Sequence, residues 1–550
     1  MPKVPFWVFI LIAILYLTAA RVATMDIDAS QYAEISREML KSGDYLHVFD
    51  RGMEYLDKPP FLFWVSAISM KCFGVNTFGY KFPSILFALF AIFATYRLAR
   101  LLYGEITGRI AALVFATCQG MFLMTNDVRC DTILMSCVIT AVWLIQEWIT
   151  KRKFFYFLGG SAAIGIGMMT KGPIALMVPV FCFTCDWILK RQWRNFIQPV
   201  YLVGLVVIAI LLAPMSIGLY QQFDLHPEKL VNGKSGVSGL RFFYWSQSFG
   251  RITGENPWKN DVDLSFLFMN MLWSFLPWVF LLIPALIINC VQLMRQKFRL
   301  LAGQEWLSTG GFLVTYLALG SSSYQLPHYI FVAYPLASIV IAKLLYQFIE
   351  EKKYQKLYKL VKPFQATVSS LIVLVSLILI VYVFPASIAV VIAWGILFIL
   401  WLYYVALNSR LAGKILWLSA SAMIFANVFL TNYAYCSLLT YQVGSQAGRY
   451  IHSHDIPGKE IVCYKMKDPL NSLQFYARET INNVDTLTAA DHPKYILTMD
   501  KGLSDLIKTG YHFDTAMQGK LFKVSELTPA FLNRNTRDNE TRNYYIIRSR

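Results

Sequence analysis

Two adjacent segments near the start of the chain decide its fold class: FWVFILIAILYLTAARVA, residues 6–23, and MDIDASQYAEISREMLKSGDY, residues 25–45. The first is close to the roughly 20 apolar residues that a membrane-spanning helix needs. It has no small-residue cleavage site, so we expect a retained helix rather than a signal peptide. The second carries Asp26 and Asp28, then an amphipathic pattern that stops at Gly43. This pattern predicts a helix that lies on the membrane surface after the first span.

The composition of the whole chain supports a membrane protein. Of its 550 residues, 56% are hydrophobic and 15% charged, whereas a soluble protein has about 25% charged residues. The mean hydropathy is +0.48, and apolar runs recur along most of the chain. The net charge of +17 would suggest nucleic acid as a partner of a soluble domain. Here much of the basic excess lies in short loops between spans, so the positive-inside rule explains it and no nucleic acid is expected.

The orientation depends on the short apolar segment 59–75, which could be a span or an interfacial helix. If it is interfacial, the loops rich in Lys and Arg all fall on one side, which the positive-inside rule makes the cytoplasm. This interpretation places the N-terminus in the cytoplasm and the tail in the periplasm. It predicts an all-α polytopic domain over 1–435, with a first periplasmic loop at 24–79 and a long one at 220–263. The expected spans, about 13, are 5–24, 80–101, 108–126, 132–150, 154–170, 172–189, 196–219, 264–293, 307–322, 328–349, 364–384, 387–407 and 414–434.

The tail, residues 436–550, is more polar and predicts a small α/β domain. Short β-like runs alternate in it with helix-like segments. The expected strands are 460–465, 494–499, 520–527 and 543–549, and the expected helices are 468–479 and 503–511. Cys436 and Cys463 could pair if this domain faces an oxidising compartment.

Ionisable and aromatic residues gather on the predicted periplasmic face, and several have bland explanations. Asp127 and Asp131 are spaced i and i+4 at a helix start, where capping is a sufficient role. Lys171 at a span end is explained by snorkelling, and a lone His328 is more often structural. The set as a whole comprises Asp26, Asp28, Asp57, Lys58, Asp127, Arg129, Asp131, Lys171, Arg241, Arg251, Glu255, Tyr324, His328 and Tyr329.

Carboxylates and cations at a lipid-facing cavity suit transfer of a group from a lipid-phosphate donor. Cations stabilise the leaving phosphate as its charge develops, and a carboxylate orients or deprotonates the acceptor. No nucleotide-binding loop is apparent in the sequence. The main alternative is a membrane transporter or flippase of a lipid-linked substrate, which would place ionisable residues in mid-span and show an inverted repeat. A receptor or scaffold is a third interpretation. The clustered charges favour the enzyme.

Several motifs resemble one known family. Asp26–Tyr45, with its D-x-x-x-Y-x-x-I-x-x-E-M pattern, resembles the first-loop signature of the bacterial aminoarabinose transferases, which belong to the protein O-mannosyltransferase-like clan of GT-C glycosyltransferases. Four further segments resemble that family's other motifs, in the same order over roughly residues 5–350: YLDKPPFLFW (55–64), NDVRCDTILM (126–135), MMTKGPIALMVP (168–179) and YQLPHYIFVAYPLAS (324–338). The resemblance implies a GT-C fold, a bacterial inner-membrane location, an undecaprenyl-phosphate-linked sugar donor and an inverting displacement at the anomeric carbon. It implies lipid A, another envelope glycoconjugate or a protein as acceptor.

The same resemblance assigns the expected site. Asp28 and Asp131 would be the catalytic acids, and the substrate-binding residues would be Tyr32, Asp57, Lys58, Lys171, Arg251 and Tyr329. A divalent cation could lie between the acids, but the sequence does not require one. Asp57 stands where the family has Glu, and Gln325 where it has Lys. Because of these departures, the identities of the sugar and the acceptor stay open. The reaction class is not affected.

Overall fold

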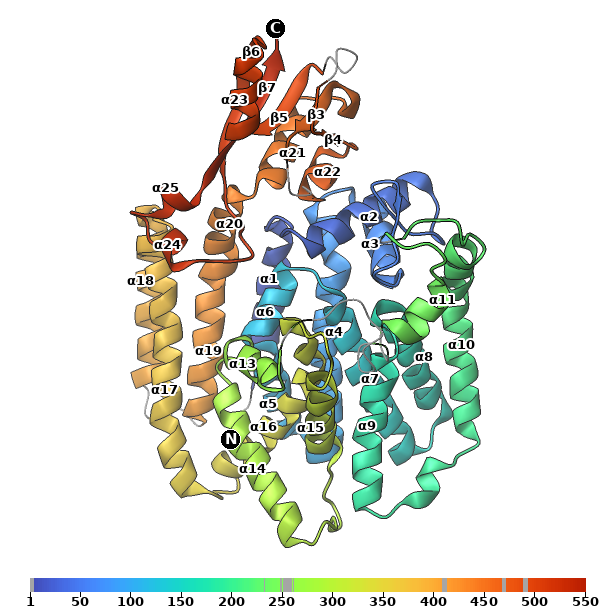
Figure 1. The fold of residues 1–550 in the computed structure, drawn as a ribbon. Coiled ribbons are helices and arrows are strands. Elements are labelled where there is room, and N and C mark those ends of the chain that lie inside the picture. The colour runs from blue at the N-terminus through green and yellow to red at the C-terminus, as the bar shows by residue number, and fades with distance from the viewer. Residues whose placement is uncertain are drawn as a thin grey trace.

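The computed structural model describes residues 4–231, 233–247, 250, 260, 262–407, 413–466, 471–487 and 493–550. A large helical region carries a small sheet domain at one end, formed by the C-terminal part of the chain (Figure 1). We call this end of the helical region the sheet-domain face. The main helices of the helical region are α1 (Phe6–Thr18), α4 (Thr77–Tyr103), α5 (Glu105–Ala116), α6 (Gln119–Asn126), α7 (Cys130–Lys151), α8 (Phe154–Lys171), α9 (Ile174–Leu189), α10 (Val200–Leu219), α13 (Ser265–Ser274), α14 (Val279–Arg295), α15 (Leu307–Gly320), α16 (Tyr334–Ile349), α17 (Gln355–Ile378), α18 (Ile388–Trp401) and α19 (Lys414–Phe429).

Each span expected from the sequence coincides with one helix or with a broken pair of helices. Among the described residues, six helical segments are long and apolar enough to cross a membrane, or seven if a bent pair counts as one span. Six further apolar helices are shorter. The polytopic helical class is confirmed, whereas length and composition do not establish the expected number of about 13 spans. The segments that qualify are Thr77–Tyr103, Cys130–Lys151, Trp193–Asp224, Pro327–Ile349, Gln355–Val383 and Lys414–Tyr441.

The helices differ in how deeply they lie in the protein. The segments Pro327–Ile349 and Cys130–Lys151 are 83% and 72% buried within the protein, against 28% for Trp193–Asp224 and for Gln355–Val383. A helix buried on all sides packs against other helices, whereas an apolar helix exposed along its length can meet lipid. The two interior segments therefore lie inside the helical region, and both begin at the cavity described below.

The expected span at 108–126 is a broken pair of helices and not one continuous helix, because the chain bends by 55° between α5 and α6. Cys118 has an extended backbone at the break. The backbone amide of Gln119 bonds to the carbonyl of Leu276 at 3.0 Å, and Trp278 donates its indole N–H to the Thr117 hydroxyl at 3.2 Å. A broken helix is tolerated within a membrane where neighbouring groups satisfy the freed backbone, and here another part of the chain does so.

The expected span at 264–293 is likewise two helices, α13 and α14, separated near Pro277. Proline lacks the N–H that would continue the hydrogen-bond ladder. The Pro277 carbonyl accepts a hydrogen bond from the Gln365 side chain at 2.7 Å. The break is again bonded to a distant helix, α17.

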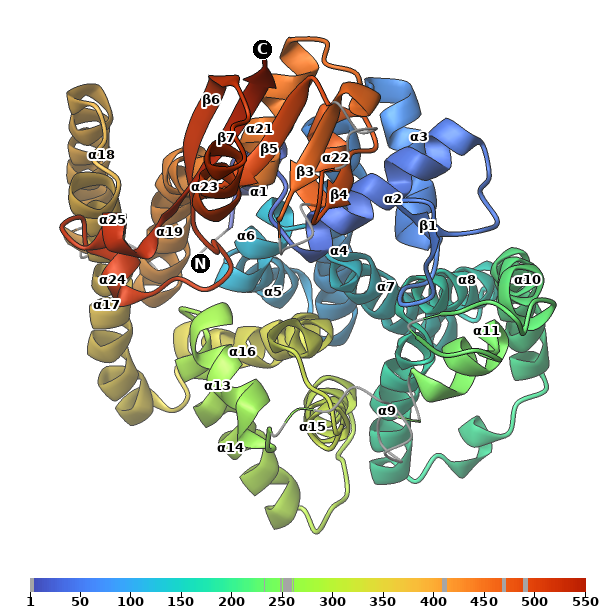
Figure 2. The ribbon, with the colours of Figure 1, turned by 45° about the horizontal axis from the view of Figure 1, so that its top comes forward.

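Two helices cover the sheet-domain face, α2 (Asp28–Ser42) and α3 (Phe61–Phe73). At 13 residues, α3 is about 20 Å long, too short to cross a bilayer core. The amphipathic helix α2 is confirmed, and it ends at Gly43, whose φ of +73° is a conformation that suits glycine. Glu34 and Arg37 of α2 are charged, but both are buried. The reason is that helix α22 (Asn471–Ala477) of the sheet domain packs on α2 (Figure 2).

The sheet domain confirms the expected small α/β domain. Its five strands lie in the order β4-β3-β5-β7-β6; β3 is parallel to β4 and β5, and β7 is antiparallel to β5 and β6. The strand expected at 520–527 is wrong, because β6 ends at Leu521 and Phe522 leaves the sheet to stack on Phe531 at 3.7 Å. The elements are α20 (Tyr435–Leu438), α21 (Val443–Ser453), β3 (Ile461–Tyr464), α22, β4 (Asn482–Val484), β5 (Tyr495–Met499), α23 (Asp500–Lys508), β6 (Phe513–Leu521), α24 (Pro529–Leu532), α25 (Arg537–Glu540) and β7 (Arg542–Ser549). Cys436 and Cys463 are both free thiols.

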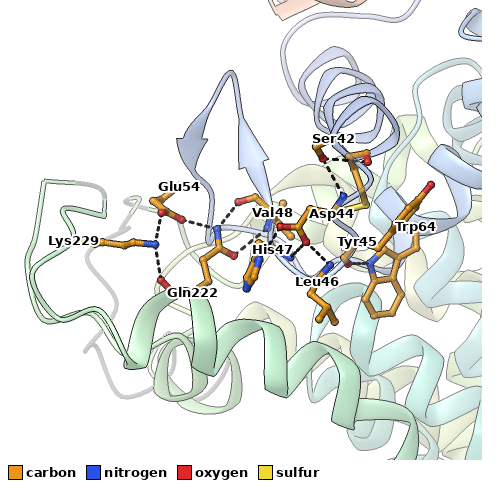
Figure 3. Close-up of polar contacts among 11 residues, drawn as sticks. Ser42, Asp44, Tyr45, Leu46, His47, Val48, Glu54, Trp64, Gln222 and Lys229 are labelled. Atoms are coloured by element: carbon orange, nitrogen blue, oxygen red, sulfur yellow. Dashed lines mark hydrogen bonds and ion pairs between the residues drawn. The ribbon is translucent and has the colours of Figure 1, made fainter.

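The loop between α2 and α3 is fixed to the segment that follows α10 (Figure 3). Its short hairpin is β1 (Phe49–Asp50) and β2 (Met53–Glu54). The Gln222 side chain exchanges two hydrogen bonds with the backbone of Val48, at 2.9 and 3.0 Å. Lys229 forms an ion pair with Glu54 at 2.6 Å. These contacts hold the loop that leads directly to Asp57 and Lys58.

Candidate active site

A cavity of about 220 Å³ opens beneath α2, between the beginning of α7 and the end of α8. Its lining combines apolar residues with charged and polar ones. The apolar lining residues are Leu134, Ile174, Met177, Ala318, Leu319, Leu326 and Val332. The charged and polar lining residues, with Cys130 and the tyrosines, are Asp28, Tyr32, Asp57, Lys58, Arg129, Cys130, Asp131, Lys171, Gln247, Ser322, Tyr324, His328 and Tyr329.

Asp28 is bound by an arginine from a distant segment. It is the first residue of α2 and forms an ion pair with Arg129, the N-cap residue of α7. Arg129 also donates to Asp127 at 2.9 Å. One guanidinium thus joins two carboxylates and fixes the start of α2 against the start of α7.

Asp131 lies in the first turn of α7 and does not cap it, because the N-cap residue is Arg129 and makes no side-chain cap. The capping explanation for Asp131 is therefore wrong. Its carboxylate instead forms an ion pair with the Lys171 ammonium at 2.5 Å, and the His328 Nε2 atom lies 3.6 Å from its other oxygen. Lys171, at the end of α8, turns into the cavity rather than out to the membrane surface.

Lys58 forms the third ion pair, with the neighbouring Asp57 at 2.6 Å. Burial alone would lower the pKa of the Lys58 ammonium, but the Asp57 carboxylate outweighs burial and raises that pKa above its ordinary value. Gln247 donates a hydrogen bond to the Asp57 carbonyl. Lys58 is therefore held as a cation at the cavity wall.

A fourth contact places an aromatic ring against the second ion pair. The Lys171 ammonium lies over the Tyr329 ring, 4.1 Å from its centroid, and the His328 ring meets Tyr329 edge to face at 5.3 Å. Tyr329 and His328 come from the 3₁₀ turn Pro327–Ala333 that precedes α16. Cation–π contacts of this kind are stronger where water is excluded.

The structure brings together seven of the eight residues expected at the site: Asp28, Tyr32, Asp57, Lys58, Asp131, Lys171 and Tyr329 all line the cavity. Arg251, the eighth, lies outside the described residues. The sequence analysis placed Arg129 on the periplasmic face without a role, treated His328 as structural and missed Cys130 and Gln247. Arg129 and Cys130 had a signal, since they stand between two acids in NDVRCD.

Asp26 faces away from the cavity and binds the sheet domain. Its carboxylate accepts hydrogen bonds from the backbone amide of Ser472 at 3.1 Å and from the Ser472 hydroxyl at 2.7 Å. It also accepts one from Ser30 within α2. Burial raises the pKa of Asp26 although these donors lower it. Asp26 thus joins α2 to the C-terminal domain, while Asp28 faces the site.

Within the part of the chain that the structure describes, His, Cys, Asp and Glu residues form no group of three or more that could hold a metal ion. The carboxylates that line the cavity each have a Lys or Arg partner instead.

The fold and the motifs resemble those of the GT-C glycosyltransferases. A family model described as "Dolichyl-phosphate-mannose-protein mannosyltransferase" matches residues 57–217, which include Asp57, Lys58, Asp131 and Lys171. The chain superimposes on the crystal structure of ArnT from Cupriavidus metallidurans bound to undecaprenyl phosphate with a TM-score of 0.72. The superposition covers 98% of this chain and 97% of that one at 16% identity, so it shows a shared fold.

In sequence, the chain resembles the aminoarabinose transferases. It is 25% identical over 324 residues to the undecaprenyl phosphate-alpha-4-amino-4-deoxy-L-arabinose arabinosyl transferase of Edwardsiella ictaluri, covering 57% of this chain and 54% of the relative. It is 28% identical over 312 residues to an enzyme of the same name from Pseudomonas fluorescens, covering 55% of this chain and 50% of the relative. The chain thus matches about half the length of these curated relatives.

Proposed function

We propose that this protein is an integral-membrane glycosyltransferase that moves a sugar from a polyprenyl-phosphate donor to an acceptor. The observation that carries the proposal is one cavity lined by three cations, three carboxylates and several apolar side chains: Lys58, Arg129 and Lys171 with Asp28, Asp57 and Asp131 are the charged residues. A lipid phosphate has a charged group and an apolar tail, so a lining of both kinds suits it. The names of the relatives, which are undecaprenyl-phosphate transferases, support the same donor.

Lys58 and Arg129 are the proposed partners of the donor phosphate. Both line the cavity, and both come from segments fixed by long-range contacts, Lys58 through the loop of Figure 3 and Arg129 through Asp28. As the bond between the anomeric carbon and the phosphate oxygen breaks, negative charge develops on the leaving phosphate. Preorganised cations stabilise that charge more in the transition state than in the ground state.

Asp28 and Asp131 are the proposed acids that position the acceptor. They enter from α2 and α7, so they approach the cavity from two elements. The acceptor oxygen forms a bond to the anomeric carbon as the phosphate leaves with the bonding electron pair. Attack from the face opposite the phosphate inverts the anomeric configuration, so a single displacement predicts an inverting enzyme.

The proposed location is the bacterial inner membrane, with the sheet-domain face in the periplasm and the N-terminus in the cytoplasm. Two features support this orientation. The basic short loops of the sequence then face the cytoplasm, and α3 is too short for the span that would reverse it. The periplasmic side makes three classes of acceptor accessible: lipid A, another envelope glycoconjugate and an envelope protein.

Deletion of the gene and mass spectrometry of the cell envelope test the proposal. Lipid A, polyprenyl-phosphate sugars and envelope glycoproteins are compared with those of the parent strain. We expect one sugar modification to disappear while its lipid-linked donor accumulates. Complementation should succeed with the native gene and with Asp538→Asn, which changes an exposed acid of the sheet domain, and fail with Asp28→Asn. Unchanged glycoconjugates, with the protein produced, would contradict the proposal.

A further inference from the structure

A second cavity lies outside the candidate active site, in a groove of about 670 Å³ lined by residues of α17, α18 and α19. We call it the α17–α19 groove. These helices stand together on one side of the helical region, away from α10 (Figure 1). Most of the lining is apolar, with Leu374, Leu377 and Leu418 among its residues. The segment Gln355–Val383 is only 28% buried within the protein, so the groove is open to lipid.

Three aromatic residues of α18 line the groove, Trp394, Phe398 and Trp401. Phe398 stacks on both tryptophans, with ring centroids 4.9 Å from Trp394 and 6.0 Å from Trp401. Trp394 donates its indole N–H to the Ser376 hydroxyl at 3.0 Å, and Trp401 donates to the Ser421 hydroxyl at 2.8 Å. Because the polar group of each indole has a partner within the protein, the aromatic surface left to the groove is apolar and fixed in position. An alkyl chain can pack along it.

Two lysines complete the lining at one end of the groove. Lys362 lies in the first half of α17, and Lys414 is the first residue of α19. The segment after α17 reaches the sheet domain, where the Tyr382 hydroxyl donates to the Asn533 side chain at 2.7 Å. The chain that follows α19 leads into the same domain. Both lysines therefore lie toward the end of the groove that is away from the sheet-domain face.

The sequence around the groove has no acid that could neutralise these lysines. No Asp or Glu stands between Glu351 and Asp455, a stretch that contains the whole of α17, α18 and α19. The positive-inside rule explains why the loop before α17 is basic, but it does not require lysines to line a groove. Basic pockets between membrane helices on the cytoplasmic side bind anionic lipid headgroups. The lysine end of the groove is therefore complementary to a lipid phosphate.

The groove has the length of one membrane leaflet. From Lys362 to Leu377, which both line it, α17 rises by about 22 Å. A bilayer with its headgroup regions is roughly 40–45 Å thick, so this rise is about half of it. A phospholipid of one leaflet thus fits with its phosphate at the lysines and a chain along the aromatic residues. The donor lipid already has a proposed cavity, at the sheet-domain face.

We propose that the α17–α19 groove is a binding site for an anionic phospholipid of the cytoplasmic leaflet. The lipid phosphate pairs with Lys362 and Lys414, and one acyl chain packs along Phe398 and the neighbouring tryptophans. This inference goes beyond the proposed function, because the phospholipid takes no part in sugar transfer. Only the choice of leaflet rests on the orientation proposed above.

Lipid titration of the purified full-length protein tests the headgroup site. The protein in detergent is titrated with phosphatidylglycerol or phosphatidylethanolamine of the same acyl chains, and bound lipid is measured by native mass spectrometry. We expect the native protein to prefer phosphatidylglycerol. Lys362→Gln and Lys414→Gln should each weaken its binding on the order of fivefold and leave phosphatidylethanolamine unaffected. Lys359→Gln is the matched control, because Lys359 is an exposed lysine of the same helix outside the groove lining.

Three results of this titration would overturn the inference. Equal affinity of the native protein for the two lipids would show no preference for anionic lipid. Equal losses in Lys359→Gln and Lys362→Gln would show a diffuse basic surface and no defined site. Displacement of phosphatidylglycerol by an equal concentration of polyprenyl phosphate would make the groove a second site for the donor lipid. None of these results bears on the proposed function, because no sugar is transferred in the experiment.

Replacement of Phe398 tests the position of the acyl chain. Phe398→Ala removes apolar surface from the groove and should weaken the binding of long-chain phosphatidylglycerol on the order of tenfold, with a smaller effect on a short-chain form. Ile399→Ala is the control, because Ile399 is 65% exposed and lies outside the groove lining. Native affinity of Phe398→Ala for the long-chain lipid would overturn the placement of the chain. Should this variant fail to fold, the exposed Lys362 and the partly exposed Lys414 still decide through their glutamine variants.

Discussion

Lys171 and Asp131 form an ion pair of 2.5 Å that joins the end of α8 to the start of α7 beneath the sheet-domain face. Both side chains are largely buried, at 16% and 3% exposure. Removal of one partner from a buried pair leaves an uncompensated charge, which costs about 3–5 kcal/mol, whereas replacement of both by apolar groups is often neutral. The pair is therefore both a structural link and part of the cavity wall.

The first prediction follows from this pair. Lys171→Met should lower the free energy of unfolding by about 3–5 kcal/mol, measured by thermal or denaturant unfolding in detergent. The double variant Lys171→Met with Asp131→Leu should recover most of that loss and remain inactive. A double variant less stable than Lys171→Met would show that the pair does not act as a unit.

Lys58 should contribute mainly to donor binding. Lys58→Gln removes a cation that we assign to the donor phosphate, and a hydrogen bond to a charged group is worth about 1.5–3 kcal/mol. The Kd for polyprenyl phosphate should rise on the order of tenfold to a hundredfold, measured by calorimetry or by a lipid-binding assay. Lys465→Gln is the matched control, because Lys465 pairs with Asp505 in the sheet domain, outside the cavity lining. Equal affinities for the native protein and Lys58→Gln would contradict the assignment.

The stability of the sheet-domain face should depend on pH through Glu38. Burial, with the charge of Glu34, raises the pKa of the Glu38 carboxyl to about 7. The folded state thus holds the proton more tightly than the unfolded state, so this contribution to stability is complete below about pH 4.5 and is lost as the pH rises through 7. Glu38→Gln removes the ionisation. The Glu38→Gln variant should therefore gain stability relative to the native protein as the pH rises from 4.5 to above 7. The difference between their free energies of unfolding should change by up to about 3 kcal/mol. A constant difference across that range would contradict this prediction.

Transfer should continue after chelation of divalent cations. Each cavity carboxylate has a Lys or Arg partner, and the cations of the cavity suffice for the proposed charge stabilisation. We expect the rate of donor consumption in EDTA to stay within about twofold of the untreated rate. A loss in EDTA that Mg²⁺ or Mn²⁺ reverses would mean that an ion completes the site.

Much of the fold followed from local patterns in the sequence. Apolar runs predicted the helices of the membrane region, and Gly43 predicted the end of α2. Breaks inside expected spans were not predictable, because they depend on distant partners such as Leu276 for the bend after α5. The burial of Glu34 and Arg37 depends on α22, more than 400 residues away in the chain.

In the candidate site, as in the fold, local sequence motifs predicted which residues take part, but not which distant residues they contact. Asp28, Lys58 and Lys171 were expected from motifs, and the structure places them at one cavity. Which cation binds which acid was not predictable, since the pairs Arg129–Asp28 and Lys171–Asp131 join separate motifs. His328 stood alone in its motif, and its position beside Asp131 joins two segments that the sequence keeps far apart.

The most direct test of the central claim is the consumption of donor by the purified protein. The full-length chain, reconstituted in lipid vesicles, is incubated with polyprenyl-phosphate sugars and acceptor membranes extracted from the deletion strain, and free polyprenyl phosphate is measured by mass spectrometry. We predict release of polyprenyl phosphate with the native protein and with Asp538→Asn, and none above background with Asp28→Asn. Equal release by the native protein and Asp28→Asn, or no release by a folded native protein, would contradict the assignment of this chain as a lipid-dependent glycosyltransferase.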